Sequence, residues 1–179
     1  MEHLLIVGTP GVGKTTLIRE CLLKYQDRAG GFMTIEVRDE NGARRGFEIM
    51  RLPDGKRGLF ASKGMASAVR LDKYGLDLAV LEELGLGAVA SARQNQAIKL
   101  IVIDEIGAME IQNENFRRLA MECLRDQAKP VLATIRSKSR PFTDDIKNIA
   151  NLRLIELTRA NYPQVKIELQ AWLKRIVGS

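Results

Sequence analysis

The chain reads Gly8-Thr9-Pro10-Gly11-Val12-Gly13-Lys14-Thr15-Thr16 between residues 8 and 16, and this stretch decides its fold. It matches the phosphate-binding pattern G-x-x-x-x-G-K-[ST] without a break. The apolar run Leu4-Leu5-Ile6-Val7 before it predicts a short buried strand, and residues 17–23 after it predict a helix. A strand, a glycine-rich turn and a helix in this order are the context that a P-loop requires.

The residue types of this loop suit the binding of a triphosphate. Glycines let the backbone curl closely around an anion, and the helix that follows points its positive end at the same place. Lys14 is expected to reach the β- and γ-phosphates, and the hydroxyl of Thr15 is expected to bind Mg²⁺. We therefore predict a catalytic role for Lys14 and nucleotide binding by the whole loop: Gly8, Thr9, Pro10, Gly11, Val12, Gly13, Lys14, Thr15 and Thr16.

A second informative stretch reads Leu100-Ile101-Val102-Ile103-Asp104-Glu105. Four apolar residues before two acids predict a strand that is buried on both faces and presents carboxylates at its C-terminal end. Because ligands of open α/β sheets bind at that end, the two acids are expected to meet the P-loop. Asp104 is then the Walker B acid that holds Mg²⁺, and Glu105 orients a water molecule for attack on the γ-phosphate. The acid pair is also typical of P-loop ATPases with an additional strand between the two Walker strands.

Length and composition indicate one globular domain, and we expect residues 1–179 to form a single P-loop domain. Hydrophobic residues make up 45% of the chain and charged residues 28%, and no apolar run approaches the ~20 residues that span a membrane. The first predicted strand begins so close to Met1 that a signal peptide has no room. Cys21 and Cys123 lack metal-ligand spacing, so we expect free thiols in a cytoplasmic protein.

The formal net charge of +6 raises the question of nucleic-acid binding. The basic residues are spread along the chain, however, and aromatic residues that could stack on bases are not interleaved with them. An enzyme that handles anionic triphosphates has its own use for positive potential. We therefore favour nucleoside triphosphates as partners over nucleic acid, and the sequence carries no signal for a particular oligomeric state.

The rest of the chain alternates strand and helix patterns. Residues 31–37 and 46–50 predict an antiparallel hairpin, because Asp39-Glu40-Asn41-Gly42 between them is a turn signal. Helices are expected over 79–94, 116–123 and 165–176, and further strands over 59–61, 131–135 and 152–157. This order predicts an α/β fold with a mostly parallel twisted sheet, helices on both of its faces, and an added antiparallel hairpin.

Further motifs are spread over nearly the whole chain. The most specific is Asp104-Glu105-Ile106-Gly107-x-Met109-Glu110; the others are Gly31-Phe32-x-Thr34-x-Glu36-Val37-Arg38, Arg45-Gly46-Phe47, Tyr74-x-x-Asp77-Leu78, Glu82-Glu83-Leu84, Ala133-Thr134-Ile135 and Leu157-Thr158. Together they resemble the thermophilic nucleoside-triphosphatase family, whose mammalian member is the cancer-related nucleoside-triphosphatase.

The resemblance implies a RecA-like P-loop fold and a single nucleoside-triphosphatase domain. It implies slow Mg²⁺-dependent hydrolysis of ATP, GTP and other nucleoside triphosphates to diphosphate and phosphate, with low base specificity. It also implies that a second segment lines the nucleotide site beside the P-loop, namely Leu100, Ile101, Val102, Ile103, Asp104, Glu105, Ile106 and Gly107.

The chain departs from the family pattern at three places. Many relatives have two acids where this chain has Ile35-Glu36, often have Pro where it has Arg136, and carry Glu-Asn-Arg where it reads Ala160-Asn161-Tyr162. The missing arginine of that last motif removes a basic side chain that could contact the nucleotide. Arg136, Lys138 and Arg140 are candidates to replace it.

Two polar residues beside these motifs have alternative interpretations. Thr134 ends the strand that follows Walker B, so it is either a sensor of the γ-phosphate or an ordinary β-branched strand residue. We interpret Glu110 as a solvated acid at a helix end rather than a partner of Asp104.

Two other functions would use the same motifs. A kinase would transfer the γ-phosphoryl group to a small acceptor on the same fold. Glu105 argues against it, because this acid suits a water nucleophile and no acceptor motif is recognisable. A nucleotide-dependent switch would use slow hydrolysis as a timer, and added RNA, DNA or protein would stimulate its rate.

Overall fold

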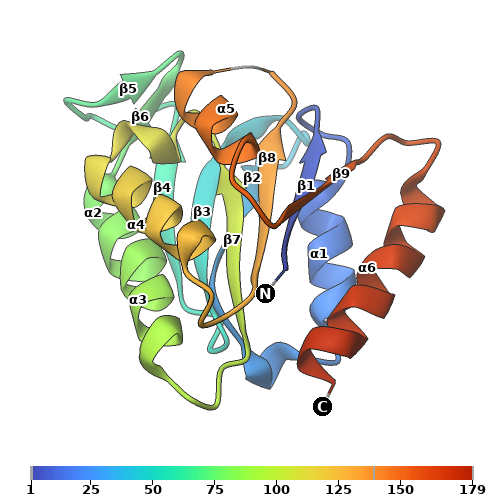
Figure 1. The fold of residues 1–179 in the computed structure, drawn as a ribbon. Coiled ribbons are helices and arrows are strands. Elements are labelled where there is room, and N and C mark those ends of the chain that lie inside the picture. The colour runs from blue at the N-terminus through green and yellow to red at the C-terminus, as the bar shows by residue number, and fades with distance from the viewer. Residues whose placement is uncertain (1, 139, 179) are drawn as a thin grey trace.

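The computed structural model describes residues 2–138 and 140–178, and its centre is one mixed β-sheet (Figure 1). The strands are β1 (His3–Gly8), β2 (Ala29–Arg38), β3 (Arg44–Leu52), β4 (Arg57–Ser62), β5 (Arg70–Leu71), β6 (Tyr74–Leu76), β7 (Leu100–Ile106), β8 (Val131–Arg136) and β9 (Leu152–Glu156). The α-helices are α1 (Lys14–Leu22), α2 (Leu78–Val80), α3 (Gly87–Gln94), α4 (Glu114–Arg125), α5 (Pro141–Lys147) and α6 (Tyr162–Val177). In the described residues the strand order is β5-β6-β4-β3-β2-β7-β8-β1-β9.

The parallel half of the sheet contains β2, β7, β8, β1 and β9. Strand β8 lies between β1, which leads into the P-loop, and β7, which carries the two acids. The predicted additional strand between the Walker strands is therefore confirmed. Because parallel strands end at the same edge of a sheet, the loop after β1 and the acids at the end of β7 meet there.

The antiparallel half begins with the predicted hairpin, which is confirmed as β2 and β3. Its turn is held by Asp39, whose carboxylate accepts hydrogen bonds from the backbone N–H groups of Asn41 and Ala43. Strands β4, β6 and β5 continue the antiparallel pairing, so this region is larger than the predicted hairpin. Strands β5 and β6 have two and three residues, too few for an alternating pattern to reveal them.

Helices cover both faces of the sheet (Figure 1). Leu17 of α1 and Trp172 of α6 belong to the core on one face, whereas Val89 of α3 and Phe116 of α4 belong to the core on the other. The helix predicted over 79–94 is present as α2, a π-helical turn and α3 in succession. Gly85 does not interrupt it. A Cβ there would lie 3.0 Å from Cδ1 of Leu81, closer than an ordinary contact, so the glycine allows close packing.

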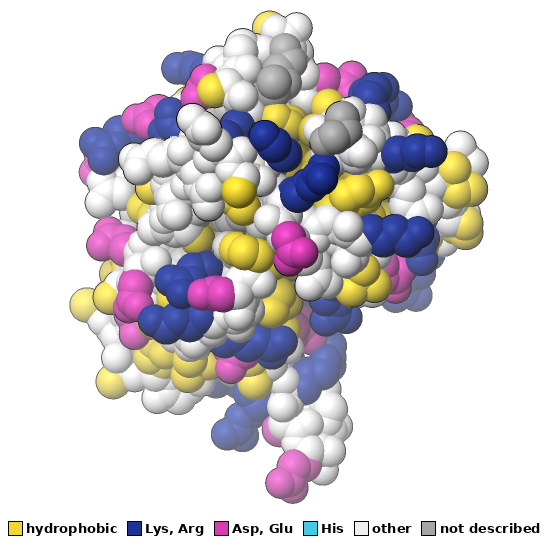
Figure 2. Space-filling view, turned by 90° about the horizontal axis from the view of Figure 1, so that it is seen from below, with side chains coloured by type: hydrophobic (Ala, Val, Ile, Leu, Met, Phe, Trp, Pro, Cys, Tyr) yellow, Lys and Arg dark blue, Asp and Glu magenta, His cyan; other side chains and the backbone are white. Residues whose placement is uncertain are grey.

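The surface carries mixed charge on the face where both termini lie. Figure 2 shows Lys and Arg side chains on this face interspersed with Asp and Glu, rather than gathered into one basic groove. Such a face lacks the clustered positive charge typical of a polynucleotide footprint. Among the described residues, no helix has the length and apolar character needed to cross a membrane.

Candidate active site

The P-loop connects β1 to α1 through a glycine that no other residue could replace without strain. Gly13 caps α1 with a φ angle of 105°, in the left-handed region that favours glycine. A Cβ at this position would also lie 3.2 Å from the ring of Tyr162 on α6. The loop and the start of α1 therefore bring backbone N–H groups and the positive helix end to one place.

Lys14 is buried at the base of this loop, with 6% of its surface exposed. Its Nζ donates hydrogen bonds to the carbonyl oxygens of Gly8, at 3.0 Å, and Thr9, at 3.3 Å. The same Nζ lies 3.5 Å from Oε2 of Glu105. The structure thus brings the predicted catalytic lysine and the predicted water-activating acid together.

Asp104 is fully buried and lies where the register between β7 and β8 shifts. Before the shift Ile103 pairs with Ala133, and after it Ile106 pairs with Ile135. Thr134 donates a hydrogen bond of 2.5 Å to Oδ1 of Asp104, whereas Oδ2 has no hydrogen-bond partner in the described residues. Burial raises the pKa of Asp104 to about 6, and the nearby hydroxyls of Thr134 and Thr15 oppose this shift. A buried carboxylate with one unpartnered oxygen suits a hard cation such as Mg²⁺.

Glu105 lies between two cationic side chains. Its Oε2 faces Lys14, and its Oε1 accepts a hydrogen bond of 3.0 Å from Nε of Arg136 at the end of β8. About one fifth of the Glu105 side chain is exposed, so it faces the cavity that the P-loop borders. The position of Glu105 is suited to a carboxylate that contacts a water molecule beside a bound phosphate.

The cavity at the P-loop has a volume of about 480 Å³. The loop and α1 border it, and so does the β2–β3 hairpin, which the sequence did not single out as part of the site. The residues that line the cavity are Pro10, Gly11, Gly13, Lys14, Thr15, Thr16, Arg19, Thr34, Ile35, Glu36, Arg38, Arg44, Phe47, Glu105 and Arg136. The arginines among them give the cavity a positive potential, which Glu36 reduces by forming ion pairs with Arg38 and Arg44.

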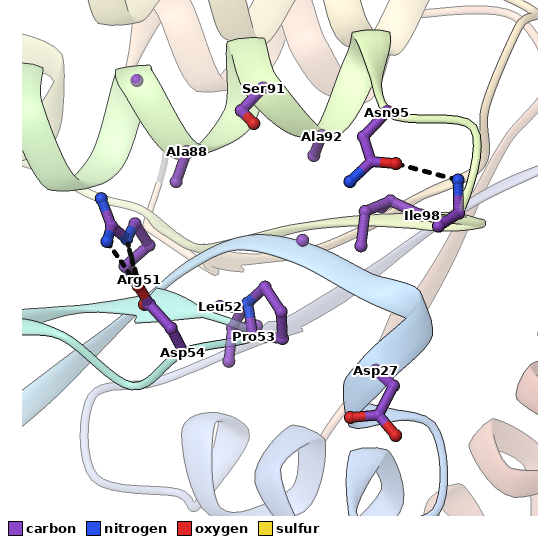
Figure 3. Close-up of a pocket in the computed structure, with 13 residues that line it drawn as sticks. Asp27, Arg51, Leu52, Pro53, Asp54, Ala88, Ser91, Ala92, Asn95 and Ile98 are labelled. Carbon is purple, nitrogen blue, oxygen red and sulfur yellow. Dashed lines mark hydrogen bonds and ion pairs between the residues drawn. The ribbon is translucent and has the colours of Figure 1, made fainter.

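Another cavity, of about 330 Å³, lies away from the P-loop (Figure 3). It is bordered by the small side chains of Ala88, Ser91 and Ala92 on α3 and by the turn after β3, where Arg51 pairs with Asp54. None of the predicted site residues lines it. It is therefore separate from the site that the Walker motifs form.

A family model described as NTPase matches residues 3–169. The chain belongs to the NTPase family. Nucleoside-triphosphatase THEP1 of Thermotoga sp. (strain RQ2) is 42% identical over 171 residues, which cover 96% of this chain and 95% of that relative.

Two solved structures have the same fold. The crystal structure of THEP1 from Aquifex aeolicus superimposes with a TM-score of 0.85 at 34% identity, over 98% of this chain and all of the other. The solution structure of a human cancer-related nucleoside triphosphatase gives a TM-score of 0.78 at 29% identity, over 98% of each chain. The resemblance and the α/β P-loop fold predicted from the motifs are confirmed, and the enzyme class expected from the sequence agrees with these names.

Several predicted site residues of this NTPase lie beneath the cavity rather than on its wall. Leu100, Ile101, Val102 and Ile103 have at most 2% of their surface exposed and form the core of β7. Of the segment 100–107, Glu105 is the residue that lines the cavity in the described structure. Thr134 is also fully buried, and its hydrogen bond to Asp104 supports the predicted Walker B acid.

Glu110 is an acidic residue whose environment was predicted wrongly from the sequence. The expectation of a solvated acid is wrong, because only 2% of Glu110 is exposed and its Oε1 accepts a hydrogen bond of 3.4 Å from the Thr34 hydroxyl. A Cβ on Gly107 would lie 2.6 Å from Oε1 of Glu105 and 2.7 Å from Oε2 of Glu110. A larger residue at position 107 would therefore displace one or both carboxyl groups from these positions. The sequence feature that could have indicated the burial of Glu110 is the spacing of the D-E-I-G-x-M-E motif.

We expect Glu110→Gln to stabilise the protein at alkaline pH. Burial, followed by the charge of Glu105, raises the pKa of Glu110 from 4.5 to about 8. Below pH 4.5 the Glu110 carboxyl group is protonated in both the folded and the unfolded chain, so its contribution to the free energy of unfolding is fully present. That contribution is lost as the pH rises toward 8, because the unfolded chain loses this proton first. Gln keeps the hydrogen bond to Thr34 and does not ionise. The free energy of unfolding of the variant should therefore exceed that of the parent by an amount that grows with pH, to about 1–3 kcal/mol at pH 8.

Urea denaturation of the nucleotide-free protein between pH 4 and 8.5 measures this difference. Glu40→Gln, at an exposed position, is the matched control and should leave the free energy of unfolding unchanged. An advantage of Glu110→Gln that does not vary with pH would contradict a protonated Glu110 in the folded protein.

Proposed function

We propose that this protein hydrolyses nucleoside 5′-triphosphates to nucleoside diphosphate and phosphate, with Mg²⁺ and with low base specificity. The observation that carries the proposal is the position of Glu105, which shares one cavity with Lys14 and Thr15 and lies 3.5 Å from Lys14 Nζ. A carboxylate beside the lysine that binds the γ-phosphate is placed to accept a proton from an attacking water. Family membership and the names of the relatives support the same reaction.

The P-loop residues Gly8 to Thr16 would bind the triphosphate through their backbone N–H groups, with Lys14 on the β- and γ-phosphates. Once a γ-phosphate binds Nζ of Lys14, the Glu105 carboxylate is released from its ion pair with Lys14 and can orient the water. The water oxygen bonds to the γ-phosphorus as the bond to the β-phosphate oxygen breaks, and the water proton passes to Glu105. The negative charge that develops is met by Lys14 and the helix end.

Thr15 and Asp104 are the residues that would hold Mg²⁺. The unpartnered Oδ2 of Asp104 supports this assignment, and Thr134 fixes the other oxygen of that carboxylate. The described residues contain no group of three or more His, Cys, Asp and Glu side chains that could hold a metal. Phosphate oxygens and water would therefore complete the ligands, the usual mode of Mg²⁺, which neutralises phosphate charge when bound.

Phosphate release from each nucleoside triphosphate, with and without Mg²⁺, tests the proposed reaction. The assay should be repeated with small acceptors and with RNA or DNA. Hydrolysis in their absence is the expected result. Phosphoryl transfer to an acceptor without hydrolysis would point to a kinase, and hydrolysis only with nucleic acid would point to a switch. We propose the cytoplasm as the compartment, since the thiols of Cys21 and Cys123 are buried and free.

We expect Asp104→Asn to weaken metal–nucleotide binding and turnover together. The amide keeps the shape of the side chain but removes the negative charge that a hard cation requires. Turnover should fall by about 10²-fold or more, the loss typical of a removed electrostatic group in an active site. Titration with Mg²⁺ at saturating nucleotide measures the effect, and chelator should abolish the activity of the parent. Full activity in excess chelator would contradict the metal assignment.

A further inference from the structure

Arg136 is placed beside the P-loop by the pairing of two parallel strands. It is the last residue of β8, and its Cα is paired with that of Gly8, the first residue of the loop, in the register between β1 and β8. The backbone at residue 136 therefore reaches the C-terminal edge of the sheet at the same level as the loop.

The side chain of Arg136 lines the same cavity as Lys14 and Thr15. Its Nε donates a hydrogen bond of 3.0 Å to Oε1 of Glu105, and 35% of the side chain is exposed. A guanidinium has five N–H donors in a planar fork that matches phosphate oxygens. Arg136 thus contacts the predicted water-activating acid from a position where it can also contact a phosphate.

The other basic residues that follow β8 lie elsewhere. Lys138 and Arg140 are exposed, and neither lines the cavity in the described part of the chain. Among the three candidates to replace the arginine missing at position 162, the fold therefore brings Arg136 alone to the P-loop cavity in the described structure.

We infer that Arg136 is a catalytic arginine supplied by the chain itself, which contacts the γ-phosphoryl group in the transition state of hydrolysis. This inference rests on the proposed function. Lys14 and Arg136 both form ion pairs with Glu105. A bound γ-phosphate competes with Glu105 for these two cations. Arg136 can serve both partners, because it lines the cavity, binds Glu105 through Nε and has further N–H donors for a phosphate. The arginine transfers no proton; it neutralises charge on the phosphoryl oxygens as the bond to the β-phosphate breaks.

Arg136→Ala should lower the single-turnover rate of phosphate release by about 10³-fold, the lower end of the range for such arginines. Binding of Mg²⁺–nucleotide should weaken by less than about 10-fold, because the ground-state contacts of the P-loop remain. Arg136→Lys should restore little of the rate, since an ammonium lacks the planar fork. Lys138→Ala and Arg140→Ala are matched controls, and both should hydrolyse at the rate of the parent.

A transition-state mimic separates this role from a structural one. Mg²⁺–ADP with aluminium fluoride should bind the parent more tightly than Mg²⁺–ADP alone, and Arg136→Ala should lose this difference while its affinity for Mg²⁺–ADP is kept. The inference is overturned if Arg136→Ala hydrolyses at the parent rate, or if its affinities for ADP and for the mimic fall by the same factor. A parent that releases no phosphate would refute the proposed function instead. The mimic still tests Arg136 in that case, because it reports on any in-line phosphoryl transfer.

Discussion

Glu105→Gln is expected to bind Mg²⁺–nucleotide normally and to hydrolyse it about 10²–10⁴-fold more slowly than the parent, the usual contribution of a positioned general base. The amide keeps the shape of the side chain and can still meet Arg136, but it has no negative charge to accept the water proton. Lys14, Thr15 and Asp104 are unchanged, so the groups assigned to nucleotide and metal remain. The loss should therefore appear in the rate of the chemical step and not in affinity.

Single-turnover phosphate release at saturating Mg²⁺–nucleotide, with a parallel binding titration, measures both quantities. Glu114→Gln makes the same chemical change at an exposed residue of α4 and should leave the rate unaltered. If Glu105→Gln binds nucleotide and hydrolyses it at the parent rate, Glu105 has no part in the mechanism. That result would favour the alternative hypothesis of a kinase, in which a hydroxyl group of the acceptor attacks the γ-phosphate instead of water.

Lys14→Ala should remove both binding and turnover. The substitution deletes charge-assisted hydrogen bonds to the phosphates, which are worth about 1.5–3 kcal/mol each, so the Kd of nucleotide should rise about 10- to 100-fold. Because the same ammonium meets the charge that develops in the transition state, the rate should fall by at least about 10²–10³-fold more. The effect on kcat/KM is the product of the two losses.

The fold should survive the loss of Lys14, because its Nζ bonds only to carbonyl oxygens of its own loop and to Glu105 in the described structure. Circular dichroism of the variant checks this point. Lys24→Ala, at an exposed lysine just beyond α1, is the control for removal of a positive charge and should behave like the parent. Hydrolysis by Lys14→Ala at the parent rate would show that the P-loop assignment is mistaken.

The local motifs could be predicted from the sequence because each is formed by residues that are close together in the chain. The P-loop is a continuous turn with its flanking strand and helix, and the run before Asp104 is apolar because β7 is covered on both faces. The hairpin was also predictable, since its turn and its two strands are adjacent in the chain. Strands β5 and β6 were not, because two and three residues pair only where a neighbouring strand is already in place.

The sequence by itself determined the P-loop motif, the strand that ends in Asp104 and Glu105, the family and the order of the main elements. The tertiary structure alone decided which distant residues meet. Arg136 lies beside Gly8 and shares the cavity with the loop and residues of the hairpin, and Thr134 bonds to Asp104 in the buried region. The tertiary structure also decided that Glu110 is buried against Thr34 rather than solvated. These positions depend on the register between strands far apart in the chain, and that register is set by packing of the whole sheet against its helices rather than by any local pattern.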